Sequence, residues 1–283
     1  MSGAVQDTAS KTGVYLYCLA RPDCLPSLKH FATLGLPGDE LPAHVTALAD
    51  DRAQPKVIAL VSDVAIDDFS EANLQTLSWV GERASQHEAV VAMAMRASTV
   101  LPVKFGTIFR TVENLKQFMA MHDAAIDQSL DALRDKSEWS VKGYLDEEVA
   151  KDIIAAADAE VTSRRAALSA SPGARYMQHK QIDALIEKAV EKGVLRVAHD
   201  LQQALLAHAD ASRVLRCHAS SVTGRAERMI FNGSFLLTPE ALADFREALA
   251  QQQEAYQVIG LSLELRGPWP AYNFCPDLSG AAL

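Results

Sequence analysis

The side chains best suited to chemistry in this sequence are its cysteines and histidines, whose spacing is a first test for a metal site or a nucleophile. The cysteines are Cys18, Cys24, Cys217 and Cys275. None of them forms the C-x-x-C pair of zinc and redox sites. The eight histidines stand singly, and His199 and His208 are nine residues apart, which places them on roughly opposite sides of a helix. We therefore predict no metal site and no cofactor.

Local motifs for catalysis are missing from the sequence as well. It contains no G-x-x-x-x-G-K-[ST] or G-x-G-x-x-G loop for phosphates, no G-x-S-x-G elbow and no H-E-x-x-H helix. Cys217 and His218 are adjacent in a predicted strand, where neighbouring side chains point to opposite faces and cannot act as a pair. Nothing in the sequence resembles an active site, and we predict no catalytic residue.

Charged pairs along the chain have simple structural interpretations. The acidic pairs Asp50-Asp51 and Asp67-Asp68 lie in predicted turns or helix caps. His87-Glu88 lies within a predicted helix without a third ligand, which favours a solvated or hydrogen-bonded pair. Arg164-Arg165 is typical of a solvated helix face.

Two segments are candidates for binding a partner. Arg175 and Tyr176 follow Pro-Gly at the start of a predicted helix, whose free N–H groups suit an anion or a carboxylate; a hairpin turn with local packing is the alternative. The segment GPWPAYNF (267–274) contributes Trp269, Tyr272 and Phe274. A disordered tail seldom keeps three aromatic residues, so we expect this one to dock on its own domain or on a partner.

The composition describes an ordinary soluble chain. It has 283 residues, 49% of them hydrophobic and 22% charged, a mean hydropathy near zero and a net charge of −9. Because a single core rarely grows past roughly 250 residues, we expect two domains. Residues up to Lys136 carry 12 basic and 17 acidic side chains, and the rest carry 15 and 19. Neither half is basic, which disfavours binding to nucleic acid or to an anionic membrane.

The same sequence predicts a reduced, cytoplasmic location. No apolar run reaches the ~18–20 residues that span a bilayer, and the first residues lack the basic and apolar regions of a signal peptide. Four cysteines are too few for a disulfide scaffold.

The first half of the chain predicts a mixed α+β domain over 1–136, with a loose leader over 1–12. Apolar and β-branched runs predict strands at 14–20, 44–50, 56–64 and 99–109. A helix is expected after Asp67, Asp68 or Ser70, and a second one follows 109. The apolar stripe of the first is Leu74, Leu77, Val80, Ala84, Val91 and Met95, and that of the second is Leu115, Phe118, His122, Ile126 and Leu133.

The second half predicts a domain over 137–283. Strands are expected at 138–146, 212–220, 228–237 and 256–267, with a helix starting at Thr238-Pro239-Glu240. A helical hairpin over 147–209, broken at Pro172-Gly173, separates the first two strands. Its stripes are Val149, Ile153, Ala157 and Val161, then Ile182, Ile186, Val190, Val197, Leu201 and Leu205. The order βαββαβ is the ferredoxin-like plan, followed by a docked tail over 267–283.

Several strings, in this order, resemble the gas vesicle accessory family that includes the F and L proteins (GvpF/GvpL). They are VYLYCLA at 14–20, VLPVKFGTIF at 100–109, EWSVKGY at 138–144, SPGARYMQHK at 171–180, FNGSFLL at 231–237 and GPWPAYNF at 267–274. LPVKFGT and GPWPAYNF are the most specific, and the resemblance runs from about Gly13 to Phe274. After the tyrosine, Gln178 and His179 replace the basic pair usual in the family.

The resemblance implies two α+β domains, the second ferredoxin-like with a helical hairpin. It implies a non-enzymatic accessory or minor structural role in building gas vesicles, the protein-walled buoyancy compartments of some prokaryotes. The implied partners are the apolar major shell protein (GvpA type) and other accessory proteins, and the implied location is the gas vesicle in the cytoplasm. Two alternatives remain: a small-molecule-binding regulatory domain or enzyme on a ferredoxin-like scaffold, and a coiled-coil scaffold built on the hairpin.

Overall fold

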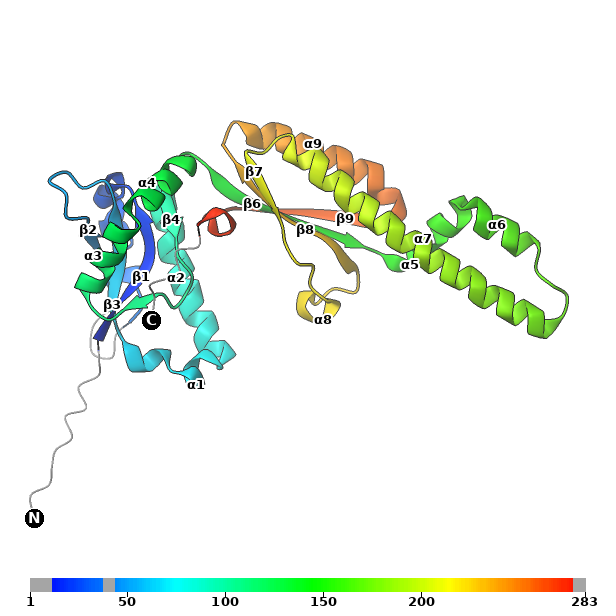
Figure 1. The fold of residues 1–283 in the computed structure, drawn as a ribbon, viewed down its shortest axis with the longest axis horizontal. Coiled ribbons are helices and arrows are strands. Elements are labelled where there is room, and N and C mark those ends of the chain that lie inside the picture. Colours follow the sequence, from blue (N-terminus) through cyan, green and yellow to red (C-terminus); the bar gives the residue numbers. More distant parts are fainter. Residues whose placement is uncertain (1–11, 38–43, 277–283) are drawn as a thin grey trace, which may run out of the picture. The chain divides into compact units, whose positions relative to one another are not determined.

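The computed structural model describes residues 12–37 and 44–276 (Figure 1). The expected leader up to residue 11, residues 38–43 and tail residues 277–283 lie outside the described residues. The chain divides into two compact units, Met1–Lys136 with Trp269–Leu283 and Ser137–Pro268. Each unit contains one antiparallel sheet covered by helices, so the fold is α+β.

The first sheet is centred on the most apolar strand of the sequence. Strand β1 (Thr12–Ala20) pairs antiparallel with β3 (Ile58–Ala65) on one side and with β4 (Val100–Pro102) and β5 (Ile108–Phe109) on the other. Strand β2 (Thr46–Ala49) extends the sheet beyond β3. The resulting order is β2-β3-β1-β4. Since β1 is central, every residue of it from Gly13 onward is buried, as its composition predicts.

Two predictions for the part of the first unit before residue 110 need correction. The strand expected over 99–109 is two short strands, β4 and β5, because Pro102 lacks the N–H for a continuous ladder and Gly106 turns the chain at a φ of +83°. The helix expected after Ser70 is divided into α1 (Glu71–Leu74) and α2 (Leu77–Ala97), preceded by the 3-10 turn η3 (Ile66–Phe69). The buried face of α2 is His87, Val90, Val91 and Ala94, whereas Leu74 and Leu77 are exposed.

The remaining helical turns of the first unit follow β1 and β5. The 3-10 segments η1 (Pro22–His30) and η2 (Ala32–Leu34) occupy most of the Pro-rich stretch after β1. Helices α3 (Val112–Met121) and α4 (Asp123–Ala132) replace the second predicted helix. They bury Leu115, Phe118, Ile126 and Leu133 of the predicted stripe.

The second sheet has the predicted βαββαβ order of elements. Its strands are β6 (Ser137–Leu145), β7 (Ala211–Val214), β8 (Arg228–Leu237) and β9 (Leu261–Trp269), in the spatial order β7-β8-β6-β9. Helix α9 (Ala241–Tyr256) and the turn η4 (Gln257–Ile259) join β8 to β9. Strand β7 ends at Val214, so Cys217 and His218 lie in a loop before α8 (Ser220–Thr223), and Cys217 is exposed.

The helical hairpin consists of three helices, because its first half is broken. Helices α5 (Glu147–Ala157) and α6 (Ala159–Ala166) both pack against the long α7 (Pro172–Leu206). Asp158 causes the break, since its carboxylate caps α6 by accepting from the N–H groups of Glu160 and Val161. The predicted stripe of α7 is buried together with Val194, but Val149 and Ile153 of α5 are 39% exposed.

Candidate functional site

From Trp269 onward the aromatic segment lies with the first unit, whereas the sequence predicts residues 267–283 to lie in the second domain. Its short helical turn η5 (Tyr272–Phe274) presents Tyr272 to helix α2. The Tyr272 hydroxyl donates to Glu88 Oε2 at 2.9 Å, and its ring lies 6.4 Å from the His87 ring. Burial and the Glu88 carboxylate raise the pKa of Tyr272. Tyr272 is therefore occupied by a contact inside its own unit.

Tyr272 belongs to a group of rings that we call the His87 cluster: the buried Tyr15, Tyr17 and His87 and the half-buried Phe69, Phe105 and Tyr272. Ring centroids of Tyr15 lie 4.9 Å from Tyr17, 5.6 Å from Phe69 and 6.3 Å from Phe105. The His87 ring lies 5.7 Å from both tyrosines. Aromatic pairs in this distance range stabilise a core beyond the area they bury.

Hydrogen bonds fix the state of His87. The Gly106 N–H donates to the Tyr15 hydroxyl at 3.2 Å, so this hydroxyl can donate to His87 Nδ1, which lies 2.8 Å away. Burial lowers the pKa of His87 to about 4, opposed by the backbone of Val103. His87 is thus held neutral, as a core residue.

The His87 cluster joins the strings that carry the family resemblance. Tyr15 and Tyr17 belong to VYLYCLA, Phe105 to LPVKFGT and Tyr272 to GPWPAYNF. These strings are far apart in the sequence and meet around one histidine. Their most specific residues therefore build the core of the first unit and hold the C-terminal segment on it.

The other aromatic residues of this segment are less enclosed. Trp269, the last residue of β9, is 44% exposed. Phe274 is half-buried, and the intervening Pro270 and Ala271 are buried. Of the three predicted residues, Trp269 offers the most surface to a partner.

The second predicted group, Arg175 and Tyr176, lies in the other unit at the turn between α6 and α7. Arg175 Nε donates to the Ser169 carbonyl at 3.0 Å, and the Ser169 N–H donates to Gln178 Oε1 at 2.7 Å. These bonds close the turn, in agreement with local packing. Tyr176 is 60% exposed, with the Lys180 ammonium 5.4 Å from its ring centroid. The aromatic segment and this turn belong to different units and are described separately.

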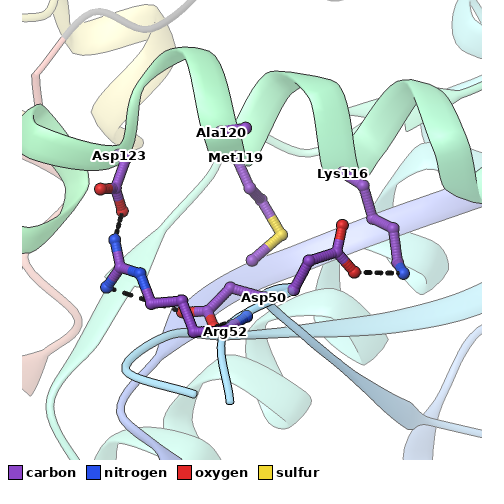
Figure 2. A pocket seen from close by; sticks show the side chains of 7 residues that line it. Asp50, Arg52, Lys116, Met119, Ala120 and Asp123 are labelled. Atoms are coloured by element: carbon purple, nitrogen blue, oxygen red, sulfur yellow. Dashed lines mark hydrogen bonds and ion pairs between the residues drawn. The ribbon is translucent and has the colours of Figure 1, made fainter. Parts of the chain in front are cut away.

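A hollow of about 290 Å³ lies in the first unit, between the β2–β3 loop and helices α3 and α4 (Figure 2). Its lining residues are Asp50, Asp51, Arg52, Lys116, Met119, Ala120 and Asp123. Lys116 Nζ binds Asp51 Oδ1 at 2.6 Å, and Arg52 pairs with Asp123. Hydrogen bonding to Asp51 raises the pKa of Lys116. The charges of the hollow are used to tie the loop to α3 and α4.

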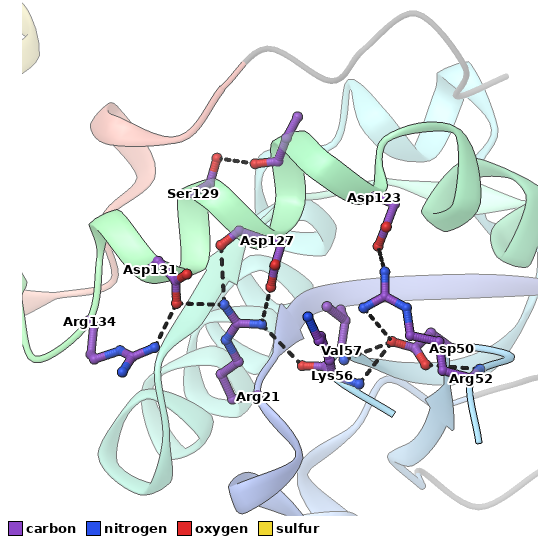
Figure 3. Close-up of polar contacts among 11 residues, drawn as sticks. Arg21, Asp50, Arg52, Lys56, Val57, Asp123, Asp127, Ser129, Asp131 and Arg134 are labelled. Carbon is purple, nitrogen blue, oxygen red and sulfur yellow. Dashed lines mark hydrogen bonds and ion pairs between the residues drawn. The ribbon is translucent and has the colours of Figure 1, made fainter. Parts of the chain in front are cut away.

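A second ion-pair network lies beside it and involves Arg21 at the end of β1 (Figure 3). Arg21 Nη1 donates to Asp127 Oδ1 at 2.5 Å, and Nη2 donates to Asp131 Oδ1 at 2.8 Å. Arg134 also donates to Asp131, at 2.6 Å. These bonds lower the pKa values of both aspartates. The network fastens α4 to the end of β1, and sequence analysis missed it because its partners are over 100 residues apart.

Two further findings concern metals and membranes. Within residues 12–37 and 44–276, no three His, Cys, Asp or Glu side chains are grouped so that they could hold a metal ion. None of the helices in this part of the chain has the length and apolarity needed to cross a bilayer.

Comparison with known proteins identifies the same family that the strings described above indicate. Residues 13–276 match the family described as "Gas vesicle synthesis protein GvpL/GvpF". Gas vesicle protein L of Streptomyces sp. (strain CB03234) is 25% identical over 92% of this chain and 91% of its own length. Gas vesicle protein F of the same strain is 28% identical over 66% and 75%. Gas vesicle protein L1 of Halobacterium salinarum is 23% identical over 97% and 94%.

Solved structures share the fold. The crystal structure of the gas vesicle protein GvpF from Anabaena sp. PCC7120 matches with a TM-score of 0.66 and 19% identity, over 94% of this chain and 96% of that one. GvpF from Microcystis aeruginosa matches with a TM-score of 0.62 and 19% identity, over 93% and 98%. With the family match over nearly the whole length, the chain belongs to the GvpL/GvpF family of gas vesicle synthesis proteins.

Proposed function

We propose that this protein is a non-enzymatic accessory or minor structural component of gas vesicle assembly in the cytoplasm. In this role it binds the apolar major shell protein (GvpA type), together with other accessory proteins, and aids shell nucleation or prevents shell aggregation. The observation that carries the proposal is the family match over residues 13–276.

A physical argument supports a shielding role. Apolar shell subunits expose helices and strand edges before they assemble, and such surfaces aggregate in water. The helical hairpin offers a contact surface, because several of its large apolar side chains are exposed. They are Val149, Ile153, Tyr176, Met177, Leu195 and Leu206. Trp269 adds a second exposed aromatic surface. The net charge of −9 would keep a complex with an apolar partner dispersed.

Co-expression with a shell protein of this type tests the proposal. The tagged chain is expected to hold shell protein in the soluble fraction and to copurify with it. Tyr176→Ala with Met177→Ala tests the hairpin, and Trp269→Ala tests the C-terminal segment. Val258→Ala is the matched control, because Val258 is 63% exposed and lies off the hairpin. If the shell protein pellets equally with and without the wild-type chain and never copurifies, the proposal is wrong.

A further inference from the structure

The turn of the helical hairpin has the opposite charge to the rest of the chain. Residues 161–182, which we call the basic tip, contain Arg164, Arg165, Arg175 and Lys180 and no acidic residue. The whole chain carries −9. The basic tip comprises most of α6, the turn and the start of α7, so its four positive charges are concentrated in one small part of the second unit.

Three of the four cations form no ion pair within the described residues, although Arg175 donates to the Ser169 carbonyl and Lys180 lies over the Tyr176 ring. Arg164 pairs with Glu160 at 2.8 Å. Arg165, Arg175 and Lys180 are exposed, and no carboxylate within the described part of the chain forms an ion pair with them. Tyr176 and Met177, 60% and 56% exposed, lie among them. The basic tip therefore combines unpaired cations with exposed apolar surface, a composition typical of protein contacts.

The first unit has a stretch with the complementary composition. Residues 63–77, which we call the acidic turn, run from the end of β3 through η3 and α1 to the start of α2. They contain Asp63, Asp67, Asp68 and Glu71, and no Lys or Arg occurs between residues 57 and 82. No cation forms an ion pair with these four carboxylates in the described ranges.

The acidic turn also offers apolar side chains to a partner. Leu77 is 89% exposed and Leu74 is 47% exposed, although both are large and apolar. Because Leu77 begins α2 and Leu74 ends α1, both lie at the junction of the two helices, next to the carboxylates in sequence. Each stretch thus has the charge that the other lacks, together with exposed apolar groups that the contact would cover.

We propose that the basic tip of one copy docks on the acidic turn of a second copy of this chain. Arg165, Arg175 and Lys180 would face Asp63, Asp67 and Glu71, while Tyr176 and Met177 would cover Leu74 and Leu77. The two surfaces differ, so the contact is heterologous: a pair of copies keeps one free tip and one free turn, and association continues into a ring or an open chain.

Charge argues for a protein partner over a polyanion. Nucleic acids and anionic membranes attract proteins through extended positive fields. Here the four cations of the basic tip belong to a chain with 36 acidic and 27 basic side chains. A second copy carries the same net charge of −9, but unlike a nucleic acid it offers the exposed apolar side chains Leu74 and Leu77 for Tyr176 and Met177 to cover.

Sedimentation equilibrium of the full chain tests the proposal. At about 20 mM salt, where screening is weak, the average mass should rise from the 30.7 kDa of the monomer as concentration increases. At about 300 mM salt it should return toward the monomer. A monomer at every concentration in low salt would overturn the proposal.

Charge reversal makes the test specific. Arg165→Glu with Lys180→Glu should weaken self-association by about tenfold or more, and so should Asp67→Lys with Glu71→Lys. In a 1:1 mixture of the two variants, association should return, because the unchanged tip of the turn variant meets the unchanged turn of the tip variant and the two reversed surfaces also have opposite charges. Circular dichroism confirms that each variant is folded.

A control variant and two polyanion probes distinguish the tip contact from a general effect of charge. Lys188→Glu with Lys192→Glu changes the net charge as much as the tip variant but lies outside the basic tip, so it should associate like the wild type. Equal loss in this control, or a mixture that stays monomeric, would overturn the proposal. Vesicles rich in phosphatidylserine and a short DNA duplex are the polyanion probes. Tip-dependent binding to either one by a monomeric wild type would assign the surface to that polyanion instead.

Discussion

Replacing Tyr272 by Phe removes one atom from the contact that holds the C-terminal segment on the first unit. The Tyr272 hydroxyl donates to the Glu88 carboxylate at 2.9 Å, and hydrogen bonds to charged groups contribute about 1.5–3 kcal/mol. Because Tyr272 is only half-buried, we expect the lower end, about 1.5 kcal/mol. That value corresponds to a roughly tenfold larger population of the undocked segment.

Hydrogen exchange measures this population at defined amides. The N–H of Tyr272 donates to the Pro270 carbonyl at 2.8 Å, and that of Phe274 donates to the Ala271 carbonyl at 3.0 Å. Both amides should exchange about tenfold faster in Tyr272→Phe, since local opening limits their exchange. Tyr176→Phe is the control: Tyr176 is 60% exposed, and this change should leave both amides unaffected. Equal exchange in wild type and Tyr272→Phe would show that the bond to Glu88 does not hold the segment.

Three other substitutions test which residues stabilise the two units. Because the pKa of His87 is lowered to about 4, the unfolded chain takes up a proton at His87 that the folded chain rejects. Stability of the first unit should therefore fall by about 1.4 kcal/mol per pH unit as the pH drops from about 6.5 to 4; urea unfolding should show a flatter profile for His87→Gln, and an unchanged profile would contradict the assignment. Ser234→Ala removes the donor 2.6 Å from the buried Glu138 carboxylate and should cost about 1–3 kcal/mol in thermal unfolding; a loss no larger than that of Ser140→Ala would argue against it. Gly106→Ala places a side chain at a φ of +83° and should cost about 1 kcal/mol by urea unfolding, despite open space around the position; equal stability would show that the turn relaxes.

Much of the fold follows from local patterns that tertiary contacts reinforce. The apolar run 14–20 is a central strand because its residues are buried on both faces of the sheet. The stripe of α7 is predicted well, since α5 and α6 pack along one continuous side of it. The strand and helix order of the second unit follows from alternating patterns and from the signal at Thr238-Pro239, where the Thr238 hydroxyl accepts from the Ala241 N–H.

Prediction fails where one residue changes the path of the chain. Asp158 looks like an ordinary exposed helix residue, yet it caps α6 and ends α5. Leu74 at the end of α1 and Leu77 at the start of α2 fit the helical period but are exposed, while His87 of α2 is buried. A histidine on an apolar face is a weak signal, and the rings that surround His87 lie far from it in the sequence, as Tyr15 and Tyr272 show.

The candidate partner-binding residues of the C-terminal segment also have environments that local sequence does not predict. The sequence places Trp269, Tyr272 and Phe274 within six residues, which indicates one shared role. Tyr272 instead contacts Glu88, 184 residues earlier, while Trp269 stays exposed. Such a pairing depends on the fold of the whole unit, so local composition predicted that the segment docks but not where.

Deletion of the gene in its own host tests the proposed assembly role most directly. Electron microscopy of the deletion strain should show no gas vesicles or only aborted ones, and the wild-type gene supplied in trans should restore them. Normal vesicles and normal flotation in the deletion strain would contradict a role in assembly.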